Sequence, residues 1–336
     1  MPRPPRRIMP RRRPSMRSLR WVLVSLTVTG ILAGPVPTAG AAFPGTEGRI
    51  AFVRKGDIWT MEPDGSDQVR LTWNGSNGNP MWSPDGSRIA FDRWTSADGL
   101  DLWVMNADGS AKYRVTKRSS DESDPAWSPT GRRLAFVSDR RGRRELFTIG
   151  AMAPFGHPRR LTDAYALEDP WIDHMGDFAP AWSPLGDAIA FTRVIVDDPG
   201  SFYGWAYVLR IVDPGTKAVT EVAAGIDGPV CPAWSPYGRR LAVQDSYLDY
   251  DHDPLTNNVW TMLPDGSSRV QVTHFAEPYT PGAGCPAWSP DAGRRIVVAA
   301  APTETSEWDI YLAPSGGQTD PLKIATNGTA PDWQPI

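Results

Sequence analysis

Short apolar runs separated by turn-forming residues recur along the chain from Gly48 to its last residues. The clearest example is PMWSPDGSRIAF, which begins at Pro80. Its proline has no N–H to donate and predicts the first position of a strand. Ser-Pro-Asp-Gly predicts a tight turn, because Pro presets φ and Gly tolerates a positive φ. The run Ile89–Phe91 is bounded by turns, which indicates a buried strand. The motif therefore predicts a β-hairpin.

The hairpin motif returns as PAWSPTGRRLAF, PAWSPLGDAIAF, PAWSPYGRRLAV, PAWSPDAGRRIVV and, cut short, PDWQP. Periods of about 40–50 residues with four short strands each are typical of a propeller. Tryptophan supplies a large flat apolar surface where one sheet packs on the next. We therefore expect the six tryptophans of the repeat to be structural residues of the innermost strands: Trp82, Trp127, Trp182, Trp234, Trp288 and Trp333.

A second motif fills the rest of each period. It reads DIWTM from Asp57, followed by a Pro-Asp-Gly turn and Arg70-Leu71-Thr72, and it returns from Asp101 and Val259. Each period thus predicts four strands. The first copy, Gly48–Phe52, lacks a Trp turn before it, whereas the last copy stops after one. We predict an all-β, six-bladed β-propeller of four-stranded antiparallel blades, closed by the C-terminal strand joining the N-terminal blade.

Residues 1–41 predict a cleaved signal peptide. Eight arginines precede an apolar run from Trp21 to Gly34, and the small residues Ala39-Gly40-Ala41 follow. The run is too short to span a bilayer, and an A-x-A site follows it. We expect cleavage after Ala41 or Ala42, with Met1 or Met16 as the start. Residues 42–336 then form the propeller, with no membrane span after cleavage and an exported location (the periplasm where an outer membrane exists).

The tandem PxWSPDGxxIAF and DIWxMxxDGSxxxxLT pattern resembles the repeat of the TolB-type six-bladed β-propeller family. The resemblance covers Gly48 to Pro335. TolB carries an α/β domain ahead of its propeller, whereas few residues separate the predicted signal from Gly48. The resemblance therefore implies a TolB-like propeller without that domain. The same repeat also occurs in propellers fused to serine peptidases, so the family implies the fold more firmly than the function.

Cleavage changes the charge of the chain. The whole chain has 35 basic and 38 acidic residues, and residues 1–41 hold eight of the basic ones, so the remainder has a net charge of 27 − 38 = −11. We find no Lys/Arg-rich stripe in the remainder, and so acidic a chain has no general attraction for phosphate backbones. This excludes nucleic acid as a partner. We expect a monomer.

The two cysteines, Cys231 and Cys285, each precede Pro-Ala-Trp in neighbouring repeats. They therefore occupy equivalent positions on adjacent inner strands, and an oxidising compartment permits a bridge between them. Inner strands converge on the axis, so Cα atoms within about 7 Å are feasible. We predict a disulfide, with two buried free thiols as the alternative.

The tight turns share one rim, which we call the short-turn rim, and the longer connections share the opposite one, the long-loop rim. Recognition is expected on the long-loop rim. Three of its loops combine aromatic and acidic residues, which suits a protein or carbohydrate partner. The candidates for partner binding are Trp171, Asp173, His174, Asp177, Tyr203, Trp205, Tyr247 and Tyr250. The alternative is that the aromatics form small loop cores and the acids are only solvated.

Metal chemistry has weak support in the sequence. Asp249, Asp251 and Asp253 have the spacing that begins a calcium loop, since hard cations prefer carboxylate oxygens. Pro254 stands where the turn glycine should be, so an EF-type site fails and only a looser calcium site remains open. Asp173, His174 and Asp177 more often form a surface cluster than a metal site. We expect no cofactor.

No G-x-S-x-G or H-E-x-x-H signature of a hydrolase is present, so no residue is assigned a catalytic role. We therefore predict a non-enzymatic binding platform that docks a protein or peptide of the cell envelope on its long-loop face. Such a platform is also what a resemblance to TolB implies, since TolB binds a lipoprotein. The alternative is a metal-dependent hydrolase or lyase that acts on a carbohydrate or small molecule in the axial channel.

Overall fold

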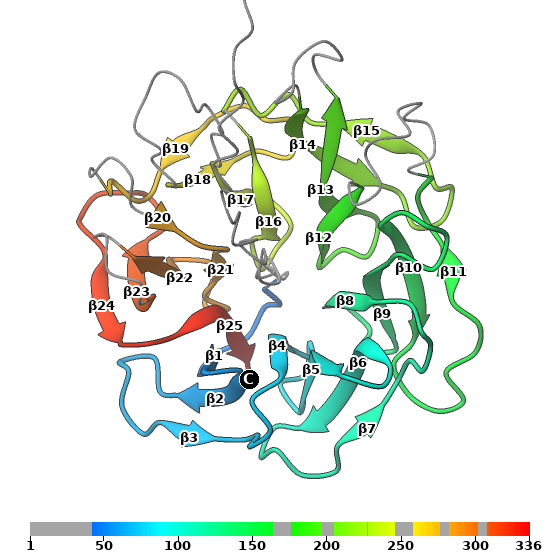
Figure 1. Cartoon of the computed structure of the whole chain (residues 1–336). Coiled ribbons are helices and arrows are strands. Elements are labelled where there is room, and N and C mark those ends of the chain that lie inside the picture. Colours follow the sequence, from blue (N-terminus) through cyan, green and yellow to red (C-terminus); the bar gives the residue numbers. More distant parts are fainter. Residues whose placement is uncertain are drawn as a thin grey trace, which may run out of the picture. The chain divides into compact units, whose positions relative to one another are not determined.

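The computed structural model describes residues 42–163, 176–196, 205–226, 228–245, 258–275, 282–301 and 308–336, and the backbone alone of Val196, Trp205, Gly282 and Ala283. Within these ranges the regular structure consists of strands, which form six sheets around a common axis (Figure 1). Each sheet is one blade. The fold is the six-bladed β-propeller that the repeat predicts.

Each blade is an antiparallel sheet whose strands follow one another outward from the axis. Blade 1 holds β25 (Thr329–Pro335), β1 (Glu47–Arg54), β2 (Asp57–Met61) and β3 (Val69–Arg70). Blade 2 holds β4 (Asn77–Trp82), β5 (Arg88–Thr95), β6 (Gly99–Asn106) and β7 (Tyr113–Arg114). Blade 3 holds β8 (Glu122–Trp127), β9 (Arg133–Ser138), β10 (Glu145–Gly150) and β11 (Arg159–Arg160).

Blade 4 holds β12 (Asp177–Trp182), β13 (Ile189–Val196), β14 (Trp205–Val212) and β15 (Val219–Glu221). Blade 5 holds β16 (Val230–Trp234), β17 (Leu241–Gln244), β18 (Val259–Met262) and β19 (Val270–Gln271). Blade 6 holds β20 (Gly282–Ala283), β21 (Ala287–Trp288), β22 (Arg295–Ala301), β23 (Asp309–Pro314) and β24 (Leu322–Ala325). The innermost strand of blade 6 is thus broken into two segments, which the sequence did not predict.

The position of the proline in the motif also differs from the prediction. Pro80 lies inside β4 rather than at its first position, beside a register shift between Gly78 and Met81. Equivalent shifts occur in β8, β12 and β16. The preceding residue adopts a positive φ, as at Asn79 (47°) and Asp124 (57°). A bulge takes proline out of the hydrogen-bonding ladder, so its missing N–H leaves no ladder bond unmade.

The tryptophans of the repeat lie on the innermost strands, as predicted, and all six are buried. Three of them bind the neighbouring blade through the indole N–H. Trp127 Nε1 donates to the carbonyl oxygen of Met81 at 3.0 Å, and Trp234 and Trp288 donate in the same way to Ala181 and Ala233. Each acceptor directly precedes the tryptophan of the preceding blade. The residue that fills the space between blades therefore also links their backbones.

The two ends of the described chain meet in blade 1. β25 pairs antiparallel with β1, with Ile50 opposite Trp333 and Ala51 opposite Asp332. The next turn is packed directly on this seam, since a Cβ at Gly86 would lie 2.2 Å from the carbonyl oxygen of Pro335. Gly86 also has a φ of 64°, which favours glycine. The predicted closure of the ring is confirmed.

Cys231 and Cys285 form a disulfide, with Cα atoms 5.1 Å apart. Both residues are buried, Cys231 within β16 of blade 5 and Cys285 between β20 and β21 of blade 6. The bond is the one predicted from their equivalent places in the repeat, and it joins neighbouring blades near the axis.

Candidate functional site

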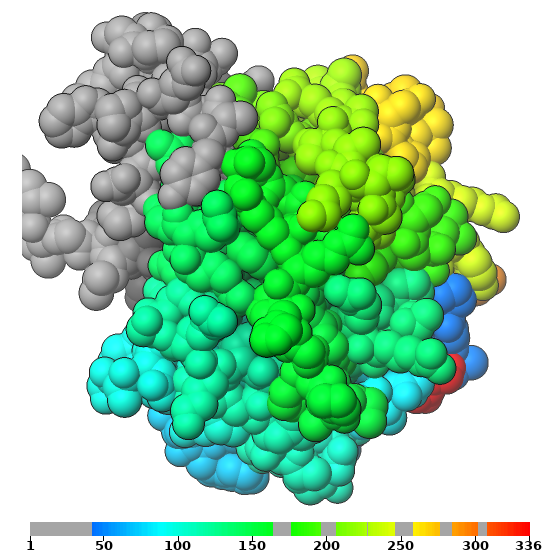
Figure 2. Space-filling model, turned by 90° about the vertical axis from the view of Figure 1, so that its right-hand side faces the viewer, coloured from blue at the N-terminus to red at the C-terminus, as the bar shows by residue number. Residues whose placement is uncertain are grey.

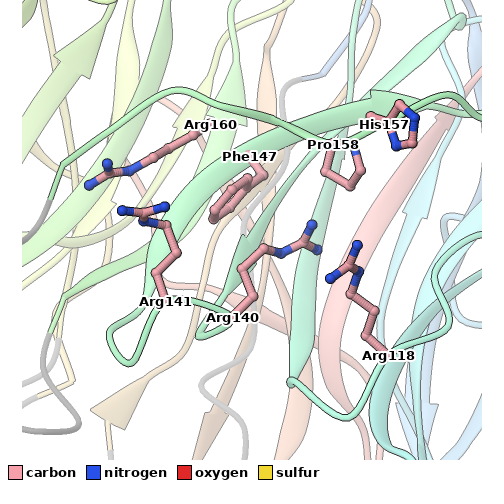
Figure 3. A pocket seen from close by; sticks show the side chains of 7 residues that line it. All are labelled: Arg118, Arg140, Arg141, Phe147, His157, Pro158 and Arg160. Atoms are coloured by element: carbon pink, nitrogen blue, oxygen red, sulfur yellow. The ribbon is translucent and has the colours of Figure 1, made fainter.

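A basic pocket lies on blade 3. It has a volume of about 390 Å³ and is lined by Arg118, Arg140, Arg141, Phe147, His157, Pro158 and Arg160 (Figure 3). A smaller lobe of about 160 Å³ shares Arg118, Arg140, His157 and Pro158 with it and adds Lys117. We call the two lobes together the basic pocket. Figure 2 shows the side of the ring on which blades 2 to 4 lie.

The pocket begins at the long-loop rim. Arg118 lies in the connection from β7 to β8, and Arg140 and Arg141 lie in the β9–β10 hairpin. His157 and Pro158 precede the outer strand β11. Because β10 runs away from the long-loop rim and β11 returns along it, the pocket extends from the rim down the outer part of the blade. Phe147 forms the wall between the two ends (Figure 3).

Arg140 is the most enclosed of the four arginines, with 11% of its side chain exposed. Its Nε donates to Ser138 Oγ at 2.8 Å, and one terminal nitrogen donates to Glu122 Oε1 at 3.1 Å. The guanidinium carbon lies 4.5 Å from the ring centre of Phe147, a cation–π contact. Burial lowers the pKa of Arg140, the Glu122 charge opposes that shift, and the Arg118 charge lowers the pKa further. The orientation of this guanidinium is therefore set by the blade.

Arg160 belongs to the repeat rather than to this pocket alone. It pairs with the buried Glu145, as Arg70 pairs with Asp57 and Arg114 with Asp101. The threonine two residues after each of these arginines is also equivalent in the three blades. Thr162 Oγ1 accepts the N–H of Leu146 at 2.9 Å, as Thr72 and Thr116 accept the N–H groups of Ile58 and Leu102. In blades 1 to 3, the Arg-x-Thr end of the outer strand thus holds an acidic residue at or near the start of the third strand. Its role in blade 3 is first structural.

Arg118 and Arg141 are the exposed arginines of the pocket. Arg118 makes no ion pair with any residue that the structure describes. Arg141 Nε lies 3.8 Å from Glu145 Oε2, a weak contact with 53% of the arginine side chain exposed. No carboxylate lines the pocket in the described ranges. The pocket therefore presents positive charge to the solvent on a chain whose propeller region is acidic overall.

None of these residues was predicted from the sequence. The net charge after cleavage is negative and no basic stripe was predicted, whereas the hairpin reads Asp139-Arg-Arg-Gly-Arg-Arg-Glu145. Four arginines in five positions were a visible signal, and Lys117-Arg118 a second one. Their convergence with Arg160 depends on blade geometry, because Arg118 and Arg160 are 42 positions apart in the chain.

Most of the predicted partner-binding residues fall outside the described residues, namely Trp171, Asp173, His174, Tyr203, Tyr247 and Tyr250, and so do the calcium candidates Asp249, Asp251 and Asp253. Trp205 is described by its backbone alone and begins β14. Asp177 is fully buried, and its Oδ2 accepts a hydrogen bond from Arg193 at 2.8 Å. The Asp177 carboxylate thus links two strands of blade 4. A role of the eight candidate residues in partner binding stays a prediction.

A second polar cluster lies on blades 2 and 3. Asn79 Nδ2 donates to Asp92 Oδ2 at 2.7 Å and to Asp124 Oδ1 at 3.2 Å. Burial raises the pKa of Asp92 to about 6. Burial, and next the charge of Asp92, raise the pKa of Asp124 to about 7. Asp124 Oδ2 also accepts the N–H of Ala179 at 3.3 Å, so this cluster ties blades 2, 3 and 4 together.

Within the described part of the chain, no three His, Cys, Asp or Glu side chains are grouped so that they could hold a metal ion. Among the same residues, none forms a helix with the length and apolar character needed to cross a membrane.

Comparison with known proteins agrees with the repeat. The TolB β-propeller domain family matches residues 54–195, from the end of β1 to β13. Residues 54–195 are therefore similar to the TolB-type β-propeller domain. An uncharacterized protein of Agrobacterium fabrum is 31% identical over 149 residues, which are 41% of this chain and 47% of that protein. The match thus spans about half the length of that relative.

Solved structures show a likeness in fold over most of the chain. TolB from Acinetobacter baumannii has a TM-score of 0.67 at 17% identity, covering 86% of this chain and 67% of that one. A putative TolB from Agrobacterium tumefaciens has a TM-score of 0.62 at 16% identity, covering 84% and 91%. A chain of a nidogen–laminin complex has a TM-score of 0.63 at 8% identity, covering 85% and 98%. At these identities the likeness shows the fold alone.

Proposed function

We propose that this TolB-type propeller is an exported, monomeric and non-enzymatic binding platform. It docks a protein or peptide of the cell envelope on its long-loop face, and the basic pocket is the anchoring point. The predicted signal peptide supports export to the envelope or beyond it, and to the periplasm where an outer membrane exists.

The observation that carries this proposal is the make-up of the basic pocket. Arginine and aromatic side chains are the residues that most often dominate the binding energy of protein interfaces. Here Arg140 is held by Glu122, Ser138 and Phe147 before any partner arrives. Because the side chain is already oriented, little conformational entropy is lost when it binds. The closed ring supplies a rigid support for this surface.

Site-specific photo-crosslinking in an envelope extract tests the proposal. A photoreactive amino acid at position 117 lines the smaller lobe and leaves all four arginines in place. The matched control is position 239, an exposed arginine after the tight turn of blade 5. We expect a discrete crosslinked protein from position 117 and none from position 239. Equal products from both positions, or none from either, would contradict docking at this pocket.

The same extract distinguishes the enzymatic alternative. Crosslinking from position 117 should persist after a chelator removes divalent cations, because the anchoring groups are guanidinium groups. Loss of the product with the chelator, and its return with added metal, would favour a metal-dependent activity instead.

A further inference from the structure

We propose that the basic pocket is an oxyanion site and that the anchor of the docked segment is a set of acidic side chains. This inference rests on the proposed function and adds the chemistry of the partner. Free phosphate shares the oxyanion chemistry, and the experiment below separates the two sources.

The pocket has more positive than negative groups on its surface. Four guanidinium groups line it, and two of the carboxylates that pair with them, Glu122 and Glu145, have no exposed surface. These acids lie behind the wall, where they neutralise Arg140 and Arg160 without meeting a ligand. Asp163 is exposed and pairs with Arg160 at 2.5 Å, so Arg160 is fully compensated. Asp139 also lies nearby, and its Oδ1 accepts the N–H of Asp121 at 2.9 Å. Arg118 remains without a compensating carboxylate among the described residues.

Arg118 and Arg140 lie close enough to form one anion-binding position. Their side chains line both lobes of the pocket, and the two positive charges oppose one another. An oxyanion between them removes this repulsion and accepts hydrogen bonds from both guanidinium groups. Such charge-assisted bonds are stronger than neutral ones, and the planar guanidinium fork matches the geometry of carboxylate oxygens.

The shape and wall of the pocket favour an acidic peptide over a small free anion. The lobes of about 390 and 160 Å³ exceed the size of one anion of a few atoms. Phe147 and Pro158 supply an apolar wall between the charged ends (Figure 3). The methylene stem of a glutamate can pack against that wall while its carboxylate reaches the arginines. A free phosphate has no such stem.

The test uses the whole mature chain and two probes, a glutamate-rich hexapeptide and inorganic phosphate, measured by calorimetry at fixed salt. The test variant is the double substitution Arg118→Gln with Arg141→Gln, which leaves the Arg140–Glu122 and Arg160–Glu145 pairs in place. The control is Arg239→Gln, an exposed arginine on another blade. We expect the double variant to weaken peptide binding about tenfold or more. The control should bind the peptide as the parent chain does, and affinity should fall as salt rises.

Three outcomes would overturn the inference. One is peptide binding that is unchanged in the double variant, and another is no peptide binding at all. The third is phosphate that binds as tightly as the peptide and displaces it, which would assign the pocket to a small anion. If the crosslinked partner at position 117 persists while the acidic peptide fails to bind, docking stands and only the acidic anchor is wrong. If no partner is crosslinked at position 117 but the acidic peptide still binds, the pocket binds acidic side chains and docking of an envelope protein there is wrong.

Discussion

At the scale of single residues, the tryptophan of the repeat has two roles. Its ring fills the space between neighbouring inner strands, and in three blades its N–H binds the carbonyl group of the blade before. Trp82 and Trp333 are equally buried, yet their Nε1 atoms have no hydrogen-bond partner among the described residues. Both flank the seam of the ring. The same residue type thus contributes differently at different blades.

We predict that Trp127→Phe costs about 1 kcal/mol more of unfolding free energy than Trp82→Phe. Both substitutions reduce a buried aromatic side chain to the same smaller ring. Only Trp127→Phe also leaves the Met81 carbonyl without its indole donor. Chemical denaturation of the two variants measures the difference, and equal losses would show that the interblade hydrogen bond contributes nothing.

At the scale of elements, β25 is the innermost strand with an acidic residue directly before the tryptophan of the repeat. Asp332 stands where the other repeats have methionine or alanine before the tryptophan. Its Oδ2 accepts the N–H of Trp82 at 2.6 Å, which joins β25 to β4. Burial raises the pKa of Asp332 to about 7, and the hydrogen bonds from Trp82 and Trp333 lower it only in part. The seam therefore contains a carboxyl group that favours the protonated form.

We predict that the propeller becomes less stable as pH rises from about 4 to about 7. In this window the unfolded Asp332 ionises near its ordinary pKa of 3.8, while the folded group holds its proton up to about 7. The folded state then binds more protons than the unfolded state, so the free energy of unfolding falls with pH. Asp332→Asn keeps an oxygen acceptor for Trp82 and should flatten this part of the profile.

The loss across the window is on the order of a few kcal/mol for this one group, and Asp92 and Asp124 act in the same direction. Denaturant unfolding at several pH values measures it. An Asp332→Asn profile as steep as that of the parent chain would show that Asp332 is not responsible for the pH dependence.

At the scale of the whole molecule, the ring is held closed by bonds at particular places, namely a disulfide, a strand pairing and side-chain hydrogen bonds. The disulfide joins blades 5 and 6, and the β1–β25 pairing closes blade 1. Gln334 adds a link across the seam, since its Nε2 donates to the carbonyl group of Gly86 at 2.7 Å. Closure protects strand edges that would otherwise pair with other chains.

We predict that deleting residues 331–336 opens the ring. The deletion removes the buried Trp333 and most of β25, and the loss of one buried Trp alone costs roughly 3–5 kcal/mol. The melting temperature should fall, and the amides of β1 that face β25 should exchange faster, because their partner strand is gone. The control is Ile336→Ala, an exposed residue at the same end. Unchanged stability on deletion would contradict closure by β25.

Prediction from the sequence went furthest where a local rule repeats. The Ser-Pro-x-Gly turn, the buried run after it and the tryptophan recur often enough to predict the blades, the closure and the disulfide. Two local details were wrong, since the proline lies within the innermost strand at a bulge and blade 6 has a broken innermost strand. Both depend on how the backbone curves near the axis, which composition does not encode.

The repeat by itself determined the number of blades, their order and which apolar residues of the repeat are buried, because blades 2 to 6 are each built from contacts within about fifty positions of the chain. Only the tertiary structure decided where the basic pocket lies, since Arg118 comes from the β7–β8 connection, Arg140 from the β9–β10 hairpin and Arg160 from strand β11. It also decided that Asp177 is a buried partner of Arg193, because burial of a charged side chain depends on which element packs over it.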